Sequence, residues 1–282
     1  RYEFIRTHLT DQFTDVRKDV SADEPLPSVS ALYRLRDNWT VFANAGVSFG
    51  PLQYFQIAST TNGLKPEKAK TYEIGTHFND LRGWGGELTL FNIDFDDELQ
   101  LQGGRGGALD AWTNLGTTTH RGVESALRYD FGALTKTLAG LSVYATYTFT
   151  DATYNQGAFA GRDLPFYSRH VATLGLRYAR QRWSVNVDGF AQSKQRSPGD
   201  PARTTVYQTR ESPSGALGDI AGYALMNLRV GYDFGKSAQN LKLALGIKNV
   251  FDRRYYTRSN DNNLGMYVGM PRTFYLQASL AY

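Results

Sequence analysis

Arginine offers the clearest binding chemistry in this 282-residue chain. Its planar guanidinium can hold a carboxylate or a similar anionic group through two parallel hydrogen bonds. Several arginines fall in segments that read as loops or loop edges, namely Arg105, Arg162, Arg196, Arg203, Arg210 and Arg258. The same loops also carry acidic side chains, so none is strongly cationic: Asp110, Asp163, Asp200 and Glu211. The arginines are candidates for an anionic, oxygen-rich ligand, and the alternative is that they are ordinary solvated side chains.

Catalytic and metal-binding chemistry has little support in the sequence. The chain has no cysteine, which excludes disulfides and cysteine-based metal sites. Two of its histidines, His77 and His120, fall inside segments that read as strands, His170 opens another, and His8 completes the set. No haem-receptor signature accompanies them, and no acid, base and nucleophile lie together as hydrolysis requires. We therefore predict no enzyme activity and no metal site built by the chain itself.

Composition alone does not separate a soluble protein from a membrane protein here. The mean hydropathy is −0.43, and no stretch approaches the roughly 20 apolar residues of a transmembrane helix. A transmembrane β-barrel keeps its mean hydropathy near neutral, because its strands alternate apolar and polar side chains. The net charge is +4, without a basic run or a stacked-aromatic motif, so we expect no nucleic-acid partner.

Period-two alternation is the main structural signal. In Leu141–Phe149, Leu, Val, Ala, Tyr and Phe share one face, while Ser, Tyr, Thr and Thr share the other. The segment 223–234 and the last strand repeat this pattern. Aromatic residues make up 13% of the chain, as expected if aromatic girdles mark two membrane interfaces. The pattern predicts half-buried strands throughout and a helix nowhere.

The connections between these strands alternate in length. Short ones fall near 37–38, 81–83, 132–140, 181–182 and 235–240, and long ones near 50–69, 102–115, 155–164 and 196–219. Short turns at one end and long loops at the other are typical of an outer-membrane barrel. About twelve strands are predicted, near 1–10, 27–36, 39–49, 70–79, 86–101, 117–131, 141–154, 166–179, 183–194, 221–234, 241–257 and 266–282. A soluble β-sandwich or propeller is the alternative, but its strands are usually shorter.

Several motifs then carry a family resemblance. Gly63–Gly75 resembles the "LKPE…E-x-G" segment of TonB-dependent receptors, and His120–Glu124 resembles their "G-[VIL]-E" strand. Leu245–Tyr256 resembles their "N-[LIV]-F-D-x-x-Y" strand. Gly269–Leu276 is similar to their final "G-x-P-R-x-[FVY]" strand, and the chain ends on the aromatic Tyr282. These motifs occur in the family's order, which makes the combination specific.

The resemblance implies the architecture and partners of a whole receptor. It implies a multi-pass barrel of about 22 strands in the outer membrane of a Gram-negative bacterium, closed by an N-terminal plug. It also implies energy from the TonB–ExbB–ExbD complex through a TonB box, with lipopolysaccharide and membrane lipid around the wall. Residues 1–282 would form the C-terminal part of the barrel domain, without plug, signal peptide or N-terminal strands. We expect such a segment neither to transport nor to fold by itself, because open sheet edges are costly in lipid.

Within the family, the resemblance is to the ferric dicitrate subgroup. The residues that support it are Pro25–Pro27, Ser48–Gly50, Gln53-Tyr54, Asn249–Asp252 and Arg258–Asn263. This implies a ligand that is a ferric chelate, either ferric dicitrate or another siderophore with carboxylate or hydroxamate groups. Fe(III) would be carried as cargo, with no covalently bound cofactor. A signalling role through an N-terminal extension also occurs in this subgroup.

The subgroup resemblance also suggests ligand-binding residues. Asn262 matches an asparagine of the last extracellular loop that contacts the ligand, and its amide can both donate and accept hydrogen bonds. Gln102 matches a polar contact in another loop, and Arg105 lies beside it. The alternative for Asn262 is an asparagine-rich turn. Asn249 and Asp252 are instead expected to bond nearby backbone, and Pro271 to fix the start of the final strand.

Two other classes of outer-membrane protein remain as alternatives. A passive diffusion porin has neither a plug nor TonB motifs, so Asn249–Asp252 and Gly269–Thr273 argue against it. An outer-membrane phospholipase has about twelve strands, but it needs a Ser/His/polar cluster on the outer wall, and we find no such set in the sequence. We therefore predict an all-β transmembrane antiparallel barrel with a transport function.

Overall fold

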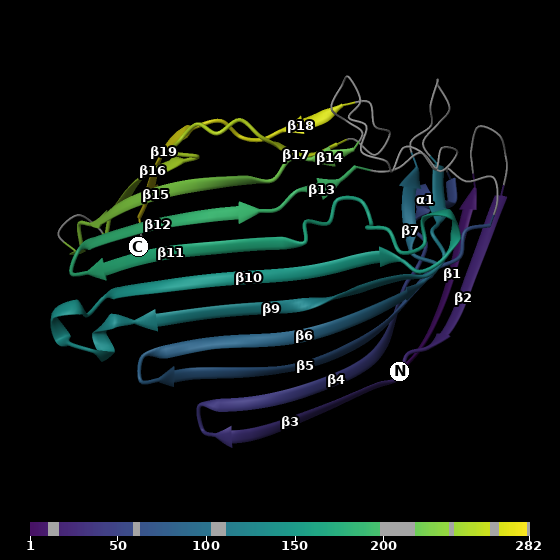
Figure 1. The fold of residues 1–282 in the computed structure, drawn as a ribbon, viewed down its shortest axis with the longest axis horizontal. Coiled ribbons are helices and arrows are strands. Elements are labelled where there is room, and N and C mark those ends of the chain that lie inside the picture. The colour runs from purple at the N-terminus through teal and green to yellow at the C-terminus, as the bar shows by residue number, and fades with distance from the viewer. Residues whose placement is uncertain are drawn as a thin grey trace.

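The protein's computed structural model describes residues 1–10, 17–58, 63–102, 111–197, 218–236, 240–259 and 265–280. A single eleven-stranded antiparallel sheet dominates it, curved into a wall (Figure 1). None of the helices in these ranges is long and apolar enough to cross a membrane.

The wall is a meander, in which each strand pairs with the next wall strand along the chain. Long alternating segments linked by tight turns favour this arrangement, because a short turn can only join antiparallel neighbours. The wall strands, from one edge to the other, are β3 (Ser28–Arg36), β4 (Trp39–Gly50), β5 (Glu67–Leu81), β6 (Trp84–Asp96), β9 (Thr118–Asp130), β10 (Leu141–Tyr154), β11 (His170–Arg180), β12 (Trp183–Gln192), β15 (Tyr223–Asp233), β16 (Lys242–Lys248) and β19 (Thr273–Ser279).

The two ends of the wall differ. At one end the strands are joined by short turns, one of which holds two 3₁₀ turns, η1 (Phe131–Ala133) and η2 (Lys136–Leu138). At the other end, the long connections and the segment before β3 form smaller elements (Figure 1). These are the hairpins β1 (Tyr2–Thr10)–β2 (Arg17–Pro25), β7 (Leu99–Gln102)–β8 (Ala111–Asn114), β13 (Gln195–Arg196)–β14 (Asp219–Ile220) and β17 (Tyr256–Ser259)–β18 (Met266–Val268), with α1 (Tyr54–Ala58) and η3 (Gly157–Phe159). We call the second end the mouth.

One face of the wall is a continuous apolar surface. Residues paired across strands point to the same side of a sheet. The register aligns Ile74 with Leu90, Leu90 with Val123 and Val123 with Phe149. Ile74 is 58% exposed, although it lies in the middle of β5, which is paired on both sides. A face of this kind is stable only against lipid or protein, which is what a membrane-facing wall requires.

The opposite face is polar and hydrogen-bonded. Asn44 on β4 donates to Glu73 on β5 over 3.2 Å. Asn186 and Asn227 donate to the two carboxylate oxygens of Asp188 over 2.9 and 2.8 Å. This face is the expected lumen side, since polar residues line the interior of transport barrels.

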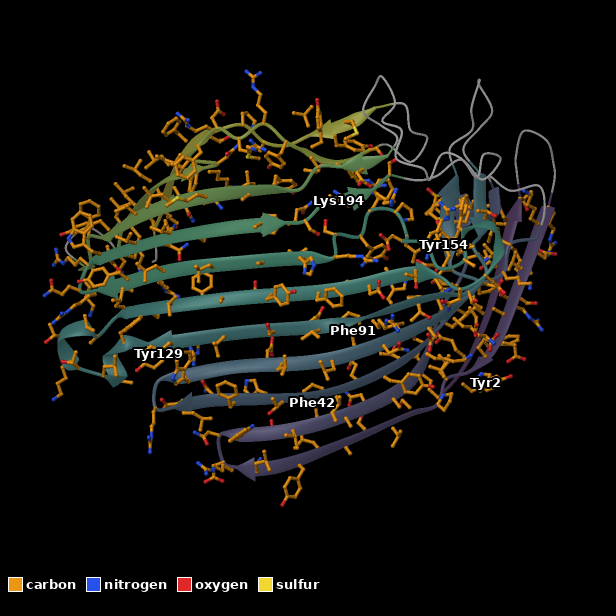
Figure 2. The ribbon with its side chains drawn as sticks, viewed as in Figure 1. Tyr2, Phe42, Phe91, Tyr129, Tyr154 and Lys194 are labelled. Atoms are coloured by element: carbon orange, nitrogen blue, oxygen red, sulfur yellow. The ribbon has the colours of Figure 1, made fainter. Side chains whose placement is uncertain are left out.

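Aromatic pairs mark the apolar face at the short-turn end. Trp84 and Tyr129 lie with ring centroids 4.5 Å apart, and Trp183 and Tyr232 lie 4.7 Å apart. Tyr129 is labelled near this end in Figure 2. Trp and Tyr favour the membrane–water boundary because their rings are apolar and their N–H or O–H groups need water or a partner. The predicted aromatic girdle is present at this end.

The structure corrects several predicted strand limits. The predicted strand 1–10 lies outside the wall and pairs with β2, a strand that was missed because its sequence is mostly charged. The predicted strand 86–101 breaks after Asp96, where Asp97 takes a left-handed φ of 57°. The strand predicted at 166–179 begins only at His170, because Phe166 has a φ of 67°. About twelve predicted strands therefore become eleven in the wall plus short hairpins at the mouth.

The predicted strands 241–257 and 266–282 are also interrupted, at a corner built around Asn249. This residue is 3% exposed and has a φ of 51°. Its side chain donates to the carbonyls of Arg253 and Met270 and accepts from the Arg253 amide, over 2.8 to 3.0 Å. The Asp252 carboxylate accepts a hydrogen bond from the Arg272 amide. The preceding residue, Pro271, has no N–H and cannot donate to a neighbouring strand. Asn249 and Asp252 thus bond nearby backbone, as predicted.

Close strand packing at Gly122 generates the first prediction. A Cβ at Gly122 would lie 1.9 Å from the Phe149 carbonyl oxygen and 2.9 Å from the ring of Phe91, which is labelled in Figure 2. Gly122→Ala must therefore move backbone, and we expect a loss of about 1–3 kcal/mol in the free energy of unfolding. The measurement is urea unfolding of the receptor in detergent. Gly189→Ala is the matched control, since its Cβ would meet nothing closer than 3.8 Å. Equal midpoints for the two variants would contradict the packing described here.

Candidate functional site

The β10–β11 connection folds back over the wall at the mouth. Leu164 is 2% exposed and packs with Ala152 and Tyr154 on β10, and Leu115 and Phe159 cover this cluster. The Leu164 amide donates to the Ala152 carbonyl over 2.8 Å, and the Gly161 amide donates to the Tyr154 carbonyl over 2.7 Å. Tyr154 is labelled at the mouth in Figure 2. The connection is therefore a folded structure with its own small core.

A polar cluster lies next to this connection. Glu98 accepts from the Thr118 hydroxyl and lies 3.3 Å from Nε2 of His120. Thr118 and His120 are buried, and the His120 ring packs edge-on against Tyr167, with centroids 4.9 Å apart. Burial and the negative charges of Glu98 and Glu67 raise the pKa of Tyr167 to about 12. Tyr167 is thus a neutral donor at physiological pH, and the cluster joins the β6–β7 bend to the β10–β11 connection.

Arginine side chains of the mouth approach the same connection from the other side. The Arg258 guanidinium lies over the ring of Phe166, 4.0 Å from its centroid. The Phe166 amide donates to the backbone carbonyl of Arg196 over 2.8 Å, while the Arg196 guanidinium lies 3.6 Å from Asp219. A guanidinium stacked on a ring stays planar and oriented, and its edge can still donate to an anion. The mouth therefore presents one cationic donor, Arg258, whose guanidinium is oriented by an aromatic ring.

The short hairpins of the mouth are tied to one another. Gln195 on β13 donates to the Thr257 carbonyl over 2.6 Å. Asp219 on β14 pairs with Lys194 at 2.6 Å and lies 3.6 Å from the Arg196 guanidinium. Lys194 is labelled at this end in Figure 2. These contacts hold the β13–β14 hairpin, which carries Arg196, against β17, which carries Arg258.

Only some of the ligand-binding candidates from the sequence lie among the residues that the structure describes. Gln102 is the last residue of β7, and its side chain is not among those described. Arg105, Asn262, Arg203 and Arg210 lie outside the described residues. The other loop arginines lie at the mouth as expected: Arg162, Arg196 and Arg258. Sequence reasoning missed Glu98, Tyr167 and Phe166, because no local pattern shows that these residues meet across distant strands.

The histidines do not gather. His8 pairs with Asp19 over 2.6 Å on the β1–β2 hairpin, and this bond with the Arg17 contact lowers the pKa of Asp19. The His170 ring lies on the apolar face, where its Nδ1 is 2.8 Å from the Tyr147 hydroxyl. His77 lies inside β5. In the described part of the chain, no group of three or more His, Asp or Glu residues is arranged to hold a metal ion.

The buried Leu164 generates a prediction about loop order. Leu164→Ala should open the β10–β11 connection, because removing a buried leucine side chain costs about 2–5 kcal/mol. Trypsin should then cleave the receptor at Arg162 or Arg169 at least about tenfold faster, as cleavage follows the population of the open form. Leu134→Ala, at a residue 66% exposed, is the matched control. Unchanged cleavage in Leu164→Ala would show that the connection is not held by this core.

Comparison with known proteins agrees with this geometry. The family model "TonB dependent receptor-like, beta-barrel" matches residues 1–250. A crystal structure of the ferric citrate transporter FecA in its unliganded form superposes with a TM-score of 0.83 at 38% identity, covering 99% of this chain and 41% of that chain.

More distant relatives name other ligands. The catecholate siderophore receptor Fiu of Escherichia coli (strain K12) is 27% identical over 89% of this chain and 32% of its own length. The metal-pseudopaline receptor CntO of Pseudomonas aeruginosa (strain UCBPP-PA14) is 26% identical over 100% of this chain and 37% of its own length.

The chain thus spans only 32% to 41% of the length of these three proteins. Its apolar outer face, polar inner face, short-turn end and folded mouth are the features of an outer-membrane transport barrel. From the wall, the motifs and the family match together, the chain belongs to the TonB-dependent receptor family and contributes β-barrel wall in the bacterial outer membrane.

Proposed function

We propose that this chain is the C-terminal part of a receptor that takes up a ferric chelate across the outer membrane, with ferric citrate as the first candidate. The observation that carries the proposal is the likeness to the ferric citrate transporter FecA, at 38% identity over nearly the whole chain. The proteins it resembles are named as receptors and transporters, which supports transport without catalysis.

The mouth chemistry supports an anionic ligand. Ferric citrate presents carboxylate oxygens, and guanidinium groups bind these oxygens through charge-assisted hydrogen bonds. Arg258 is oriented by the Phe166 ring, and Arg196 on the neighbouring strand β13 lies 3.6 Å from Asp219. Asn262, Arg105 and Gln102 are proposed to complete the binding set from neighbouring loops. Fe(III) is cargo in this proposal, held by the citrate and not by protein side chains.

Transport requires parts beyond the wall. We propose that an N-terminal plug and TonB box connect the receptor to the TonB–ExbB–ExbD complex. Ligand capture at the mouth would precede a TonB-driven rearrangement of the plug. Lipopolysaccharide and membrane lipid are the proposed surroundings of the apolar face.

A different ferric siderophore is the second candidate. The observation in its favour is that Fiu is named for catecholates and CntO for metal–pseudopaline, and both cover most of this chain. An oriented arginine such as Arg258 suits any anionic chelate, so the described residues favour a class of ligand over any one member of it. A passive diffusion porin is disfavoured by the family match.

Ferric citrate titration of the complete receptor tests the proposal. Intrinsic tryptophan fluorescence should show saturable quenching with ferric citrate and little response to ferric catecholates. A response to a catecholate or hydroxamate complex alone would keep the receptor and discard citrate. No saturable response to any of these chelates would argue against the proposed function.

Arg258 provides the sharpest variant. Arg258→Ala should weaken ferric citrate binding about tenfold to a hundredfold, because a hydrogen bond to a charged group contributes about 1.5–3 kcal/mol. Arg258→Lys should recover only part of this loss, since a lysine keeps the charge but not the fork. Arg180→Ala, at the short-turn end, is the control that should bind normally. Equal affinities for Arg258→Ala and Arg180→Ala would remove Arg258 from the site.

A further inference from the structure

Two arginines lie in one row on the polar inner face of the wall, below the mouth. Arg177 on β11 is paired in register with Asn186 on β12, and Asn186 is paired with Arg229 on β15 (Figure 1). Asn186 belongs to the hydrogen-bonded polar face, and residues paired across strands point to the same side of a sheet. All three side chains therefore face the lumen, and we call Arg177, Asn186 and Arg229 the arginine row.

Neither guanidinium of the row has a hydrogen-bond partner or a counter-ion among the described residues. Arg177 is exposed, and Arg229 is half-buried. Asp130 lies in the same row two strands away on β9, where it accepts from the Gly132 amide over 2.8 Å. A half-buried charge is unfavourable unless water, a counter-ion or a ligand contacts it. The row is therefore available to an anion in the lumen.

The acidic side chains on this part of the inner face are engaged elsewhere. Within the described wall strands from β10 to β19, the inner face carries two of them, Asp188 and Asp233. The two carboxylate oxygens of Asp188 accept from the amides of Asn186 and Asn227, over 2.9 and 2.8 Å. Asp233 pairs with Lys242 at 3.0 Å. The arginine row consequently keeps its positive charge.

The row continues a line of cations that begins at the mouth. Arg258 lies at the mouth on β17, and Lys248 follows on β16, with its Nζ 5.9 Å from the centroid of the Tyr275 ring. Arg229 is paired with Gly246, two residues deeper on β16 than Lys248, or roughly 7 Å further along the strands. These cations therefore succeed one another along the direction that a ligand takes from the mouth into the barrel.

A hollow of about 350 Å³ lies beside Arg229, toward the short-turn end. The inner-face residues that line it include the small Ser184, Gly231 and Ala244 and the amide side chain of Gln277. Small side chains leave room against the wall, and Arg229 lines the same hollow. The inner face thus offers space for a small anionic molecule next to an unpaired guanidinium.

We propose that the arginine row binds carboxylate oxygens of the anionic ferric chelate after the chelate has left the mouth, during its passage through the barrel. Arg177 and Arg229 are two strands apart, or roughly 10 Å, so they flank an anion that lies over Asn186. Each guanidinium can donate two parallel hydrogen bonds to a carboxylate. This inference rests on the proposed uptake of an anionic chelate, and it adds residues inside the barrel to those at the mouth.

A carboxylate of the proposed plug is the other source of the same chemistry. A fixed ion pair with the plug would need only one cation of the wall. The chelate is favoured because the cations follow one another from the mouth inward, through Lys248 to Arg229, and because the hollow lies at the end of this line.

The test compares two measurements on the complete receptor: uptake of radioactive ferric citrate by cells, and ferric citrate binding by the purified protein. Arg177→Gln with Arg229→Gln should slow uptake about tenfold, because the loss of one hydrogen bond to a charged group corresponds to a change of roughly this size. Binding at the mouth should be unchanged. Arg177→Lys with Arg229→Lys should recover part of the rate, since lysine keeps the charge without the fork.

The matched control is Arg34→Gln with Arg128→Gln. It removes two cations from the same inner face, on β3 and β9, outside the arginine row. The control should take up and bind ferric citrate normally. If the row variant does not reach the outer membrane, Arg177→Gln alone gives the decision, because this exposed side chain can change without loss of packing. Its uptake should still be several-fold slower than that of Arg34→Gln.

Equal uptake by the row variant and the control would overturn the proposal. A lower urea unfolding midpoint of the ligand-free row variant, together with a changed affinity at the mouth, would also overturn it, because this result assigns the arginines to the plug. The unaltered receptor separates this inference from the proposed function. If it neither binds nor takes up ferric citrate, both fail, whereas normal binding and uptake with an unaffected row variant removes the arginine row alone.

Discussion

Backbone hydrogen bonding in lipid is the constraint on which the rest of this structure depends. No water is available there to satisfy a free amide or carbonyl, so each strand must pair with neighbours on both sides. The meander does this for its nine inner strands with a continuous antiparallel register, and β3 and β19 form its two edges. Because side chains alternate along each strand, the same register separates an apolar face from a polar one. Ile74 and Glu73, adjacent in sequence, consequently face different surroundings.

The mouth follows from the same constraint. Beyond the membrane the chain can leave the ladder, and connections become hairpins and folded loops. Their backbone groups form hydrogen bonds with nearby segments, as when the Gly161 and Leu164 amides donate to carbonyls of β10. Side chains become available there for ligand chemistry, and the Arg258–Phe166 stack is an example. The wall therefore provides a rigid frame, and the mouth is where we propose that the ligand binds.

Sequence reasoning reached the wall because alternation is a property of one strand at a time. The strand 141–154 was predicted with its limits, and the family was identified from short motifs. Corners were harder to predict, since Asp97, Phe166 and Asn249 take left-handed backbone conformations that the pattern of apolar residues does not reveal. The Glu98–His120–Tyr167 cluster joins three segments that are far apart in sequence. It could therefore be found only once the fold was known. Asn262 and Arg105 lie outside the described residues and remain predictions.

The most direct test of the two-faced wall uses spin labels on single introduced cysteines, because this chain contains no cysteine of its own. Labels at Leu90 and Leu174 should collide often with dissolved oxygen in a lipid bilayer and rarely with a polar nickel complex. Labels at Thr89 and Thr173, one residue away, should show low exposure to oxygen. Similar oxygen exposure at both members of a pair, or the reverse order, would contradict the account of a membrane-spanning barrel wall.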